Sequence, residues 1–243
     1  MRIQQLCTVF ALTLASFAQA GEAVVIDIDE ANAPFMYARD GKAAGIYPAL
    51  IEAAFKRMNV PVSVQAKPWS KAIQEIDAGT AGVAGIYKNA EREKKYDYSE
   101  QIFVERLVVF FNKSNPLNYT KLEDLYGKRV GVMKGWSYGD DFDKARKAGA
   151  IPCEDADSDA QNFQKMDQHH LDASVAVFES GNALLPKYKS IAYAATALSR
   201  NPTFLAFAKS AGRGALIKQF DQAVKDLKAS GELQKIVQGE LAR

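Results

Sequence analysis

Residues 85–99 read Gly-Ile-Tyr-Lys-Asn-Ala-Glu-Arg-Glu-Lys-Lys-Tyr-Asp-Tyr-Ser and include the end of an apolar run over residues 81–86. The apolar run predicts a buried strand that ends at Tyr87, and the polar residues after it predict a turn. Arg92 stands five positions past Tyr87, close enough to fold back over the strand tip. A guanidinium beside the exposed backbone N–H groups of that tip suits a carboxylate. The alternative is that Arg92 is a solvated arginine at the start of a charged helix.

The residues before this stretch alternate between strand and helix patterns. Apolar runs predict strands over residues 23–28, 60–65 and 81–86. Recurrence of apolar residues at helical spacing predicts helices over residues 48–58 and 69–78. The order strand-helix-strand-helix-strand predicts a parallel sheet flanked by helices.

A second block of the same kind covers roughly residues 113–195. Before it, a long strand pattern over residues 102–111 is interrupted by Glu105 and Arg106, which indicates a segment that crosses between two lobes. Asn201 and Pro202 predict another break in the chain. The expected elements of this half are strands 130–133, 172–178, 191–197 and 203–208, and helices 121–126, 138–147, 158–171, 181–188 and 213–229, followed by a last helix through residues 233–237.

The first twenty residues have the parts of a secretory signal peptide. Arg2 is basic, residues 6–17 are apolar, and Ala18 and Ala20 form a small-x-small cleavage site before Gly21. The apolar run is too short for a permanent membrane-spanning helix. We therefore expect export to the periplasm, removal of residues 1–20, and no stable membrane insertion of the remaining chain.

Charge and motif content exclude several classes of function. The chain has 31 Lys and Arg against 29 Asp and Glu, and loss of Arg2 with the signal leaves it nearly neutral, which argues against a nucleic-acid partner. His169 and His170 are adjacent, so on a helix they face different directions and do not share a metal. Cys153 has no Cys or His at ligand spacing. The Walker and H-E-x-x-H motifs are missing from the sequence, and we expect no cofactor, no metal and no catalytic residue.

Several motifs resemble the periplasmic amino-acid-binding proteins of ABC transporters, bacterial solute-binding proteins of family 3. They are Ala33-Pro34-Phe35, Glu91-Arg92 with Tyr98-Ser99, residues 125–132 with Gly135, and the helix end at residues 221–231. The resemblance implies an α/β type II periplasmic-binding fold with two crossover segments, near residues 104–107 and 196–202. It also implies a first lobe of residues 21–105 plus 200–243, on which the C-terminal helices pack, and a second lobe of residues 106–199.

In that family an Arg clamps the carboxylate of the ligand, and Arg92 matches it. The sequence departs from the family at Asn89, where a Thr is usual, and at Tyr87, where a Ser or Thr hydroxyl usually helps to hold the carboxylate. The expected ligand-binding residues are Asp29, Glu30, Asn32, Trp69, Gly85, Tyr87, Arg92, Gly135, Trp136, Ser137 and Glu179.

A second set of donors comes from Gly135, Trp136 and Ser137. A strand leads into this turn and a helix leads out of it, so its backbone N–H groups and the Ser137 hydroxyl lie at a helix N-terminus, which favours an anion. A capped helix after a tight turn is the alternative. The resemblance implies that this turn closes on the carboxylate from the opposite lobe.

The remaining expected contacts concern the rest of the ligand. The resemblance places Trp69 against the ligand side chain, with Tyr87 as a second wall, and implies side-chain recognition by the loop after the first strand. A family member also supplies an Asp for the α-amino group. Five residues past Asp172 this chain has Val177 instead, so Glu179 is the candidate, and a ligand without an α-amino group is expected if Glu179 points away.

We therefore expect a non-enzymatic, monomeric, periplasmic solute-binding protein that delivers a small carboxylate, an amino acid or a derivative, to the permease of an ABC importer. One alternative is a periplasmic enzyme of the same fold, similar to a cyclohexadienyl dehydratase, with Glu30 and Glu179 as acid and base. A ligand-sensing partner of a membrane receptor is the other alternative.

Overall fold

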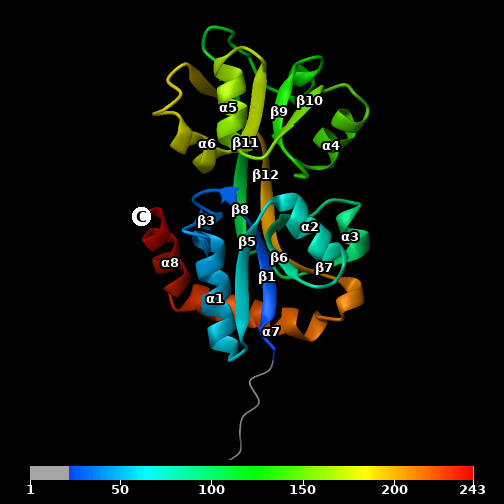
Figure 1. Ribbon diagram of the computed structural model, residues 1–243, viewed down its shortest axis with the longest axis vertical. Coiled ribbons are helices and arrows are strands. Elements are labelled where there is room, and N and C mark those ends of the chain that lie inside the picture. Colours follow the sequence, from blue (N-terminus) through cyan, green and yellow to red (C-terminus); the bar gives the residue numbers. More distant parts are fainter. Residues whose placement is uncertain (1–21, 243) are drawn as a thin grey trace, which may run out of the picture.

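The computed structural model describes residues 22–242, and the expected signal peptide over residues 1–20 lies outside them. Figure 1 shows two groups of helices and strands joined by two long strands, β8 (Phe103–Asn112) and β12 (Ile191–Ala208). We call the group that contains β1 the first lobe and the group that contains β9 the second lobe. Among the described residues, no helix combines the length and the apolar character needed to cross a membrane.

One sheet of nine strands runs through both lobes, with the order β10-β9-β11-β8-β12-β6-β1-β5 and with β7 paired to β12. In the first lobe, β1 is parallel to both β5 and β6. In the second lobe, β9 is parallel to both β10 and β11. The strands other than β8 and β12 are β1 (Val24–Asp29), β5 (Val62–Lys67), β6 (Gly82–Tyr87), β7 (Tyr96–Tyr98), β9 (Val130–Met133), β10 (Cys153–Ala156) and β11 (Ala173–Val177).

Helices flank this sheet as the alternating pattern predicts. A small antiparallel sheet of β2 (Ala31–Asn32), β3 (Met36–Arg39) and β4 (Lys42–Ala44) follows β1. The helices are α1 (Ile46–Met58), α2 (Trp69–Asp77), α3 (Arg92–Lys95), α4 (Asp140–Lys147), α5 (Asp159–Asp167), α6 (Phe178–Leu184), α7 (Gly214–Ala229) and α8 (Glu232–Leu241), with 3-10 turns at η1 (Leu122–Leu125) and η2 (Lys209–Ala211).

The C-terminal helices pack on the first lobe, as expected, where α7 and α8 cover α1 (Figure 1). The rings of Phe55 and Phe220 lie 6.1 Å apart between α1 and α7. Arg57 on α1 donates to Glu232 on α8 at 2.8 Å. The first lobe therefore contains both the first and the last elements of the described residues.

The predicted break at Asn201 and Pro202 is wrong, because β12 runs through both residues without interruption. Pro202 pairs with Val104 of β8, whereas β12 gains β6 as its second neighbour only from Thr203 onward. Pro202 therefore lies where the strand has a neighbour on one side only, the position at which a strand tolerates a residue without an N–H.

The crossover is located by the strand partners. β8 pairs with β11 of the second lobe only from Leu107, and β12 pairs with β6 of the first lobe only from Thr203. The charged pair Glu105-Arg106 thus stands where β8 passes between the lobes. The lobe boundaries at 105/106 and 199/200 fall in this stretch and stay a prediction.

Candidate functional site

The two lobes meet around a small cavity that most of the predicted site residues line. Its walls come from β3, α2, β6 and α3 of the first lobe and from the turn after β9 of the second. The enclosed volume is about 10 Å³, and the lining residues are Met36, Trp69, Gly85, Tyr87, Arg92, Trp136 and Ser137. A volume of this size is about that of one water molecule, so the lobes are closed in this structure.

Arg92 lies at the junction of the two lobes. Its guanidinium donates to the carbonyl oxygen of Tyr87 at 3.2 Å and to that of Gly135, across the cleft, at 3.2 Å. It also stacks over the Trp69 ring, 5.8 Å from the ring centre. Burial lowers the pKa of Arg92, yet a guanidinium stays cationic at neutral pH. A single cation thus faces both halves of the cleft.

The second predicted donor set differs from expectation at its backbone. Gly135 turns its carbonyl oxygen toward the first lobe, where it accepts from Arg92 and from the Trp69 indole at 3.1 Å. The Trp136 N–H donates within the turn to Met133 at 3.1 Å. The backbone φ of +77° at Gly135 is one that side chains strain, which explains the glycine.

Three aromatic rings form the walls of the cavity. The Trp136 ring lies 6.2 Å from that of Trp69 and 6.1 Å from that of Tyr87, edge to face in both pairs. All three side chains are more than nine-tenths buried. At Gly85, any Cβ would come within 2.8 Å of Met36 and Tyr47, so glycine is required for these side chains to approach the strand.

Asp29 ends β1 and is buried under the second lobe. Its carboxylate accepts from the Trp136 indole at 2.8 Å and from the Ala31 N–H at 2.9 Å. Burial raises the pKa of Asp29 to about 6. Glu30 is exposed beside it, in a groove of about 340 Å³ that also includes Lys134 and Asp157. Asp29 lines the same groove, so the two acids are neighbours with different roles: Asp29 holds the Trp136 indole, and Glu30 faces solvent.

Further hydrogen bonds join the two lobes. Asn89 donates to the Ser137 hydroxyl at 3.1 Å, and its side-chain oxygen accepts from the backbone N–H of Arg92 at 2.8 Å. Ser137 in turn donates to Asp143 of α4. Ser180 of α6 donates to Asn32 at 2.6 Å. The residue that departs from the usual Thr, Asn89, is thus a contact between the lobes.

Five predicted residues are outside the cavity lining: Asp29, Glu30, Asn32, Gly135 and Glu179. Of these, Asp29 and Gly135 hydrogen-bond to side chains that line it. Glu179 is exposed in the first turn of α6, next to the buried Ser180. Its charge nevertheless acts on the interior, because it contributes to raising the pKa of Glu105.

Glu105 is a buried acid in the crossover segment, and the sequence pattern does not assign it to the site. Its carboxylate accepts from the Tyr47 hydroxyl at 2.5 Å and from the Tyr87 hydroxyl. Thr203 of β12 donates to Tyr47 at 3.1 Å. Burial raises the pKa of Glu105 to about 7. A Glu within an apolar strand was the available signal; it places Glu105 directly behind the Tyr87 wall.

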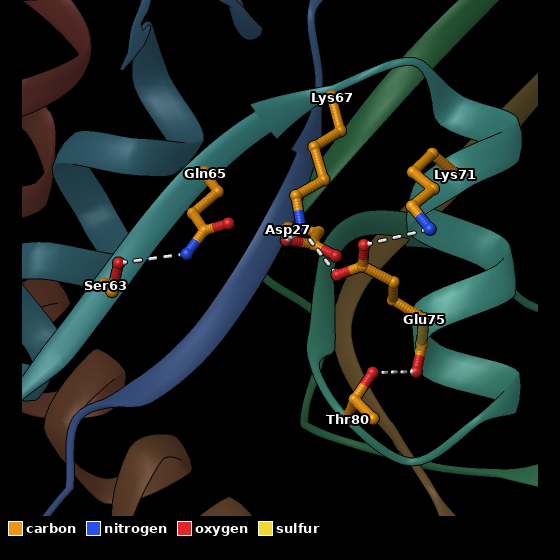
Figure 2. A network of polar contacts seen from close by, with 7 residues as sticks. All are labelled: Asp27, Ser63, Gln65, Lys67, Lys71, Glu75 and Thr80. Carbon is orange, nitrogen blue, oxygen red and sulfur yellow. Dashed lines mark hydrogen bonds and ion pairs between the residues drawn. The ribbon is translucent and has the colours of Figure 1, made fainter.

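A charged network holds α2, which carries Trp69, against β1, which carries Asp29. Figure 2 shows Lys67 reaching from the end of β5 to Asp27 and Glu75. The Lys67 ammonium lies 3.1 Å from Asp27, which is fully buried, and also pairs with Glu75 of α2. Lys71, more exposed, lies 3.6 Å from Glu75. The network fixes two elements whose ends line the cleft.

Comparison with known proteins gives one family for nearly the whole described chain. Residues 24–239 match the profile of "Bacterial extracellular solute-binding proteins, family 3". The L-cystine-binding protein TcyJ of Escherichia coli (strain K12) is 23% identical, over 96% of this chain and 91% of its own length.

Solved structures with the same fold include two of particular interest. An ancestral arginine-binding protein bound to arginine is 24% identical, with a TM-score of 0.78 over 89% of this chain and 97% of its own. A histidine kinase sensor domain with similarity to periplasmic binding proteins is 18% identical, with a TM-score of 0.82 over 91% of this chain and 97% of its own. At sequence identities of 24% and 18%, these two similarities show a shared fold only.

Proposed function

Because the chain belongs to the bacterial extracellular solute-binding proteins of family 3, we propose that it binds a small carboxylate between its lobes and delivers it to an ABC importer. Amino acids and their derivatives are the first candidates, since the similar proteins include ones named for cystine and arginine. The protein acts in the periplasm as a monomer, and its closed form docks on the permease.

One observation carries the proposal: the Arg92 guanidinium is the charge at which the two lobes meet. In the closed arrangement it donates to two neutral carbonyl oxygens, those of Tyr87 and Gly135. A carboxylate is a stronger acceptor for a guanidinium than a carbonyl is, and it can accept two parallel bonds. Opening the lobes therefore exposes a donor for which a carboxylate competes well.

Closure around a ligand requires Trp136 to move. The 10 Å³ between the aromatic walls has room for about one water molecule. It is too small for a carboxylate ligand. The indole is held by Asp29 of the opposite lobe, so opening the lobes releases it. The ligand then shifts the equilibrium between open and closed forms by the difference in its affinity for the two.

The proposal is tested on protein that has been unfolded, freed of bound small molecules and refolded. We expect a thermal-shift panel of amino acids and organic acids to give at least one carboxylate that raises the melting temperature. Arg92→Ala should weaken its binding by about 2–5 kcal/mol in calorimetry, because the ligand loses a desolvated charge partner. The matched control is Arg213→Ala, which removes an exposed arginine of the same lobe. A carboxylate that binds both variants with wild-type affinity would contradict the clamp.

A sensing role is the second candidate, and the likeness to a histidine kinase sensor domain favours it. The same closure would then be read by a membrane receptor instead of a permease. Uptake of the labelled ligand separates the two roles: loss of the chain should abolish uptake for a transport protein and leave it unchanged for a sensor. The enzymatic alternative gains less support, since its candidate acid and base, Glu30 and Glu179, lie outside the cavity lining.

A further inference from the structure

The charges around the cavity bear on which carboxylates fit, an inference that rests on the proposed function. Of the residues that line the cavity, Arg92 carries a full charge, whereas the others are aromatic, apolar or hydroxyl-bearing. An α-amino acid brings an ammonium within two bonds of its carboxylate carbon. Once the carboxylate is seated on Arg92, that ammonium needs an acidic partner nearby, or it is buried without one at a large cost.

Three acids accept hydrogen bonds from side chains of the cavity lining, and in the closed form each of them is engaged by two donors, whereas Glu30 and Asp157 face the adjoining solvent-open groove. Asp29 accepts from the Trp136 indole and from the Ala31 N–H, which belongs to its own lobe. Glu105 lies behind Tyr87 and accepts from two tyrosine hydroxyls. Asp143 accepts from the Ser137 hydroxyl and from the Tyr138 N–H at 3.0 Å. Binding an ammonium at Glu105 or Asp143 would displace a donor from within the protein, and at Asp29 it would take the place of the bond that the Trp136 indole makes in the closed form.

Strand β11 ends in an apolar residue at the same edge of the second-lobe sheet as the Gly135–Ser137 turn. β9 and β11 are parallel, so their carboxyl ends lie at the same edge. The Gly135–Ser137 turn follows β9 there, and β11 ends at Val177, which is fully buried in the apolar cluster that also contains Trp136. Glu179 stands two residues further on, exposed on α6.

We infer that this site selects carboxylates that carry no α-ammonium group and that present an apolar or aromatic body to Trp69, Tyr87 and Trp136. The guanidinium supplies the charge for the carboxylate, and the rings supply contact area for the body. The carboxylate is thus recognised by charge, and the carbon next to it meets apolar surface.

Matched pairs of ligands test this on refolded, ligand-free protein. Each pair is an amino acid and the same molecule without its α-amino group: L-phenylalanine and 3-phenylpropanoate, L-cystine and 3,3′-dithiodipropanoate, L-arginine and 5-guanidinopentanoate. Calorimetry should show that, in every pair in which either member binds, the deaminated member binds at least about tenfold more tightly. Equal or tighter binding of the amino acids would overturn the inference and leave the proposed function intact.

A second experiment introduces an acidic partner for the α-ammonium group. Val177→Asp places a carboxylate at the end of β11, and we expect it to reduce or reverse the preference within a pair. Val177→Asn is the control, because asparagine has about the size and polarity of aspartate but no charge. It should keep the wild-type preference for the deaminated member of each pair. An equal shift in both variants would overturn the inference. If circular dichroism shows that Val177→Asp does not fold, the wild-type pairs decide alone.

The two possible failures remain distinguishable. If none of the six compounds binds and a wider panel of carboxylates also gives no Arg92-dependent binding, the proposed function fails and this inference with it. If carboxylates bind through Arg92 but the amino acid of each pair is preferred, only the inference fails.

Discussion

At the scale of single residues, Glu105 makes a prediction about pH. Burial raises the pKa of this carboxyl from its usual 4.5 to about 7. Between these values the unfolded chain has lost the proton and the folded protein keeps it, so stability falls as pH rises from about 4.5 to about 7. The loss from this group is about 3 kcal/mol. The unfolding free energy, measured in urea, should therefore fall from pH 5 to pH 8 in the wild type. Glu105→Gln should remove the contribution of Glu105 to that fall.

The control for this prediction is Glu52→Gln, which changes an exposed side chain on α1. It should leave the pH dependence of the unfolding free energy as it is in the wild type. Other buried acids act in the same direction, since burial also raises the pKa of Asp159 to about 7. Glu105→Gln should therefore flatten the curve without levelling it, and an unaltered curve would show that Glu105 does not retain its proton.

Local sequence was informative for residues whose role depends on their neighbours along the chain. Arg92 was predicted to reach the strand tip at Tyr87 because five positions separate them, and its guanidinium does contact the Tyr87 carbonyl. Glu105 could not be assigned in this way. Its partners Tyr47 and Tyr87 lie 58 and 18 positions away, and only the sheet brings them together. Nor could spacing tell that Gly135 would offer its carbonyl.

At the scale of elements, the network under α2 predicts a pH-dependent cost for losing Lys67. Lys67→Met leaves the fully buried Asp27 next to Glu75 without the cation that lies between them. Breaking a buried ion pair in this way costs about 3 kcal/mol or more in unfolding free energy. The cost should be smaller at pH 5 than at pH 8, because burial raises the pKa of Asp27 to about 6 and the acid then holds a proton.

Lys71→Met is the matched control, since Lys71 pairs with the same Glu75 but its side chain is 56% exposed. An exposed pair of this kind contributes less than about 1 kcal/mol. Urea unfolding of the two variants at both pH values gives the comparison. Equal destabilisation by the two substitutions would mean that the ion pairs in Figure 2 act as ordinary surface pairs and do not hold α2 against β1.

Most elements were predictable where apolar periodicity was strong, and their ends were less so. The helix expected over residues 48–58 is α1, which begins two residues earlier at Ile46. The helix expected over residues 181–188 begins at Phe178 instead. β12 was divided at Pro202 because a proline usually interrupts a strand. Its continuity depends on β8, a partner that local patterns do not specify.

At the scale of the whole molecule, a small number of contacts holds the two lobes together. Hydrogen bonds of Asp29 with Trp136 and of Ser180 with Asn32 join residues of opposite lobes. Asp29→Ala combined with Ser180→Ala removes two hydrogen bonds that exist only in the closed form, together about 2 kcal/mol. The open form should gain more than about tenfold in population. Small-angle X-ray scattering should then report a larger radius of gyration.

Ser174→Ala provides the control, because Ser174 is also buried but donates to Gly131 within the second lobe at 3.2 Å. It should leave the radius of gyration unchanged. If the double variant scatters like the wild type, the closed form is held by contacts other than these two.

The facing indoles have a practical consequence. Trp69 and Trp136 are the two tryptophans of the sequence, one from each lobe, and their ring centres lie 6.2 Å apart. Indoles this close couple their electronic transitions, so the pair should produce an exciton signal in circular dichroism. That signal should vanish when the lobes open. The two tryptophans thereby report lobe opening without an added label. Stopped-flow circular dichroism would measure the rate of opening and closing after the protein is mixed with a ligand.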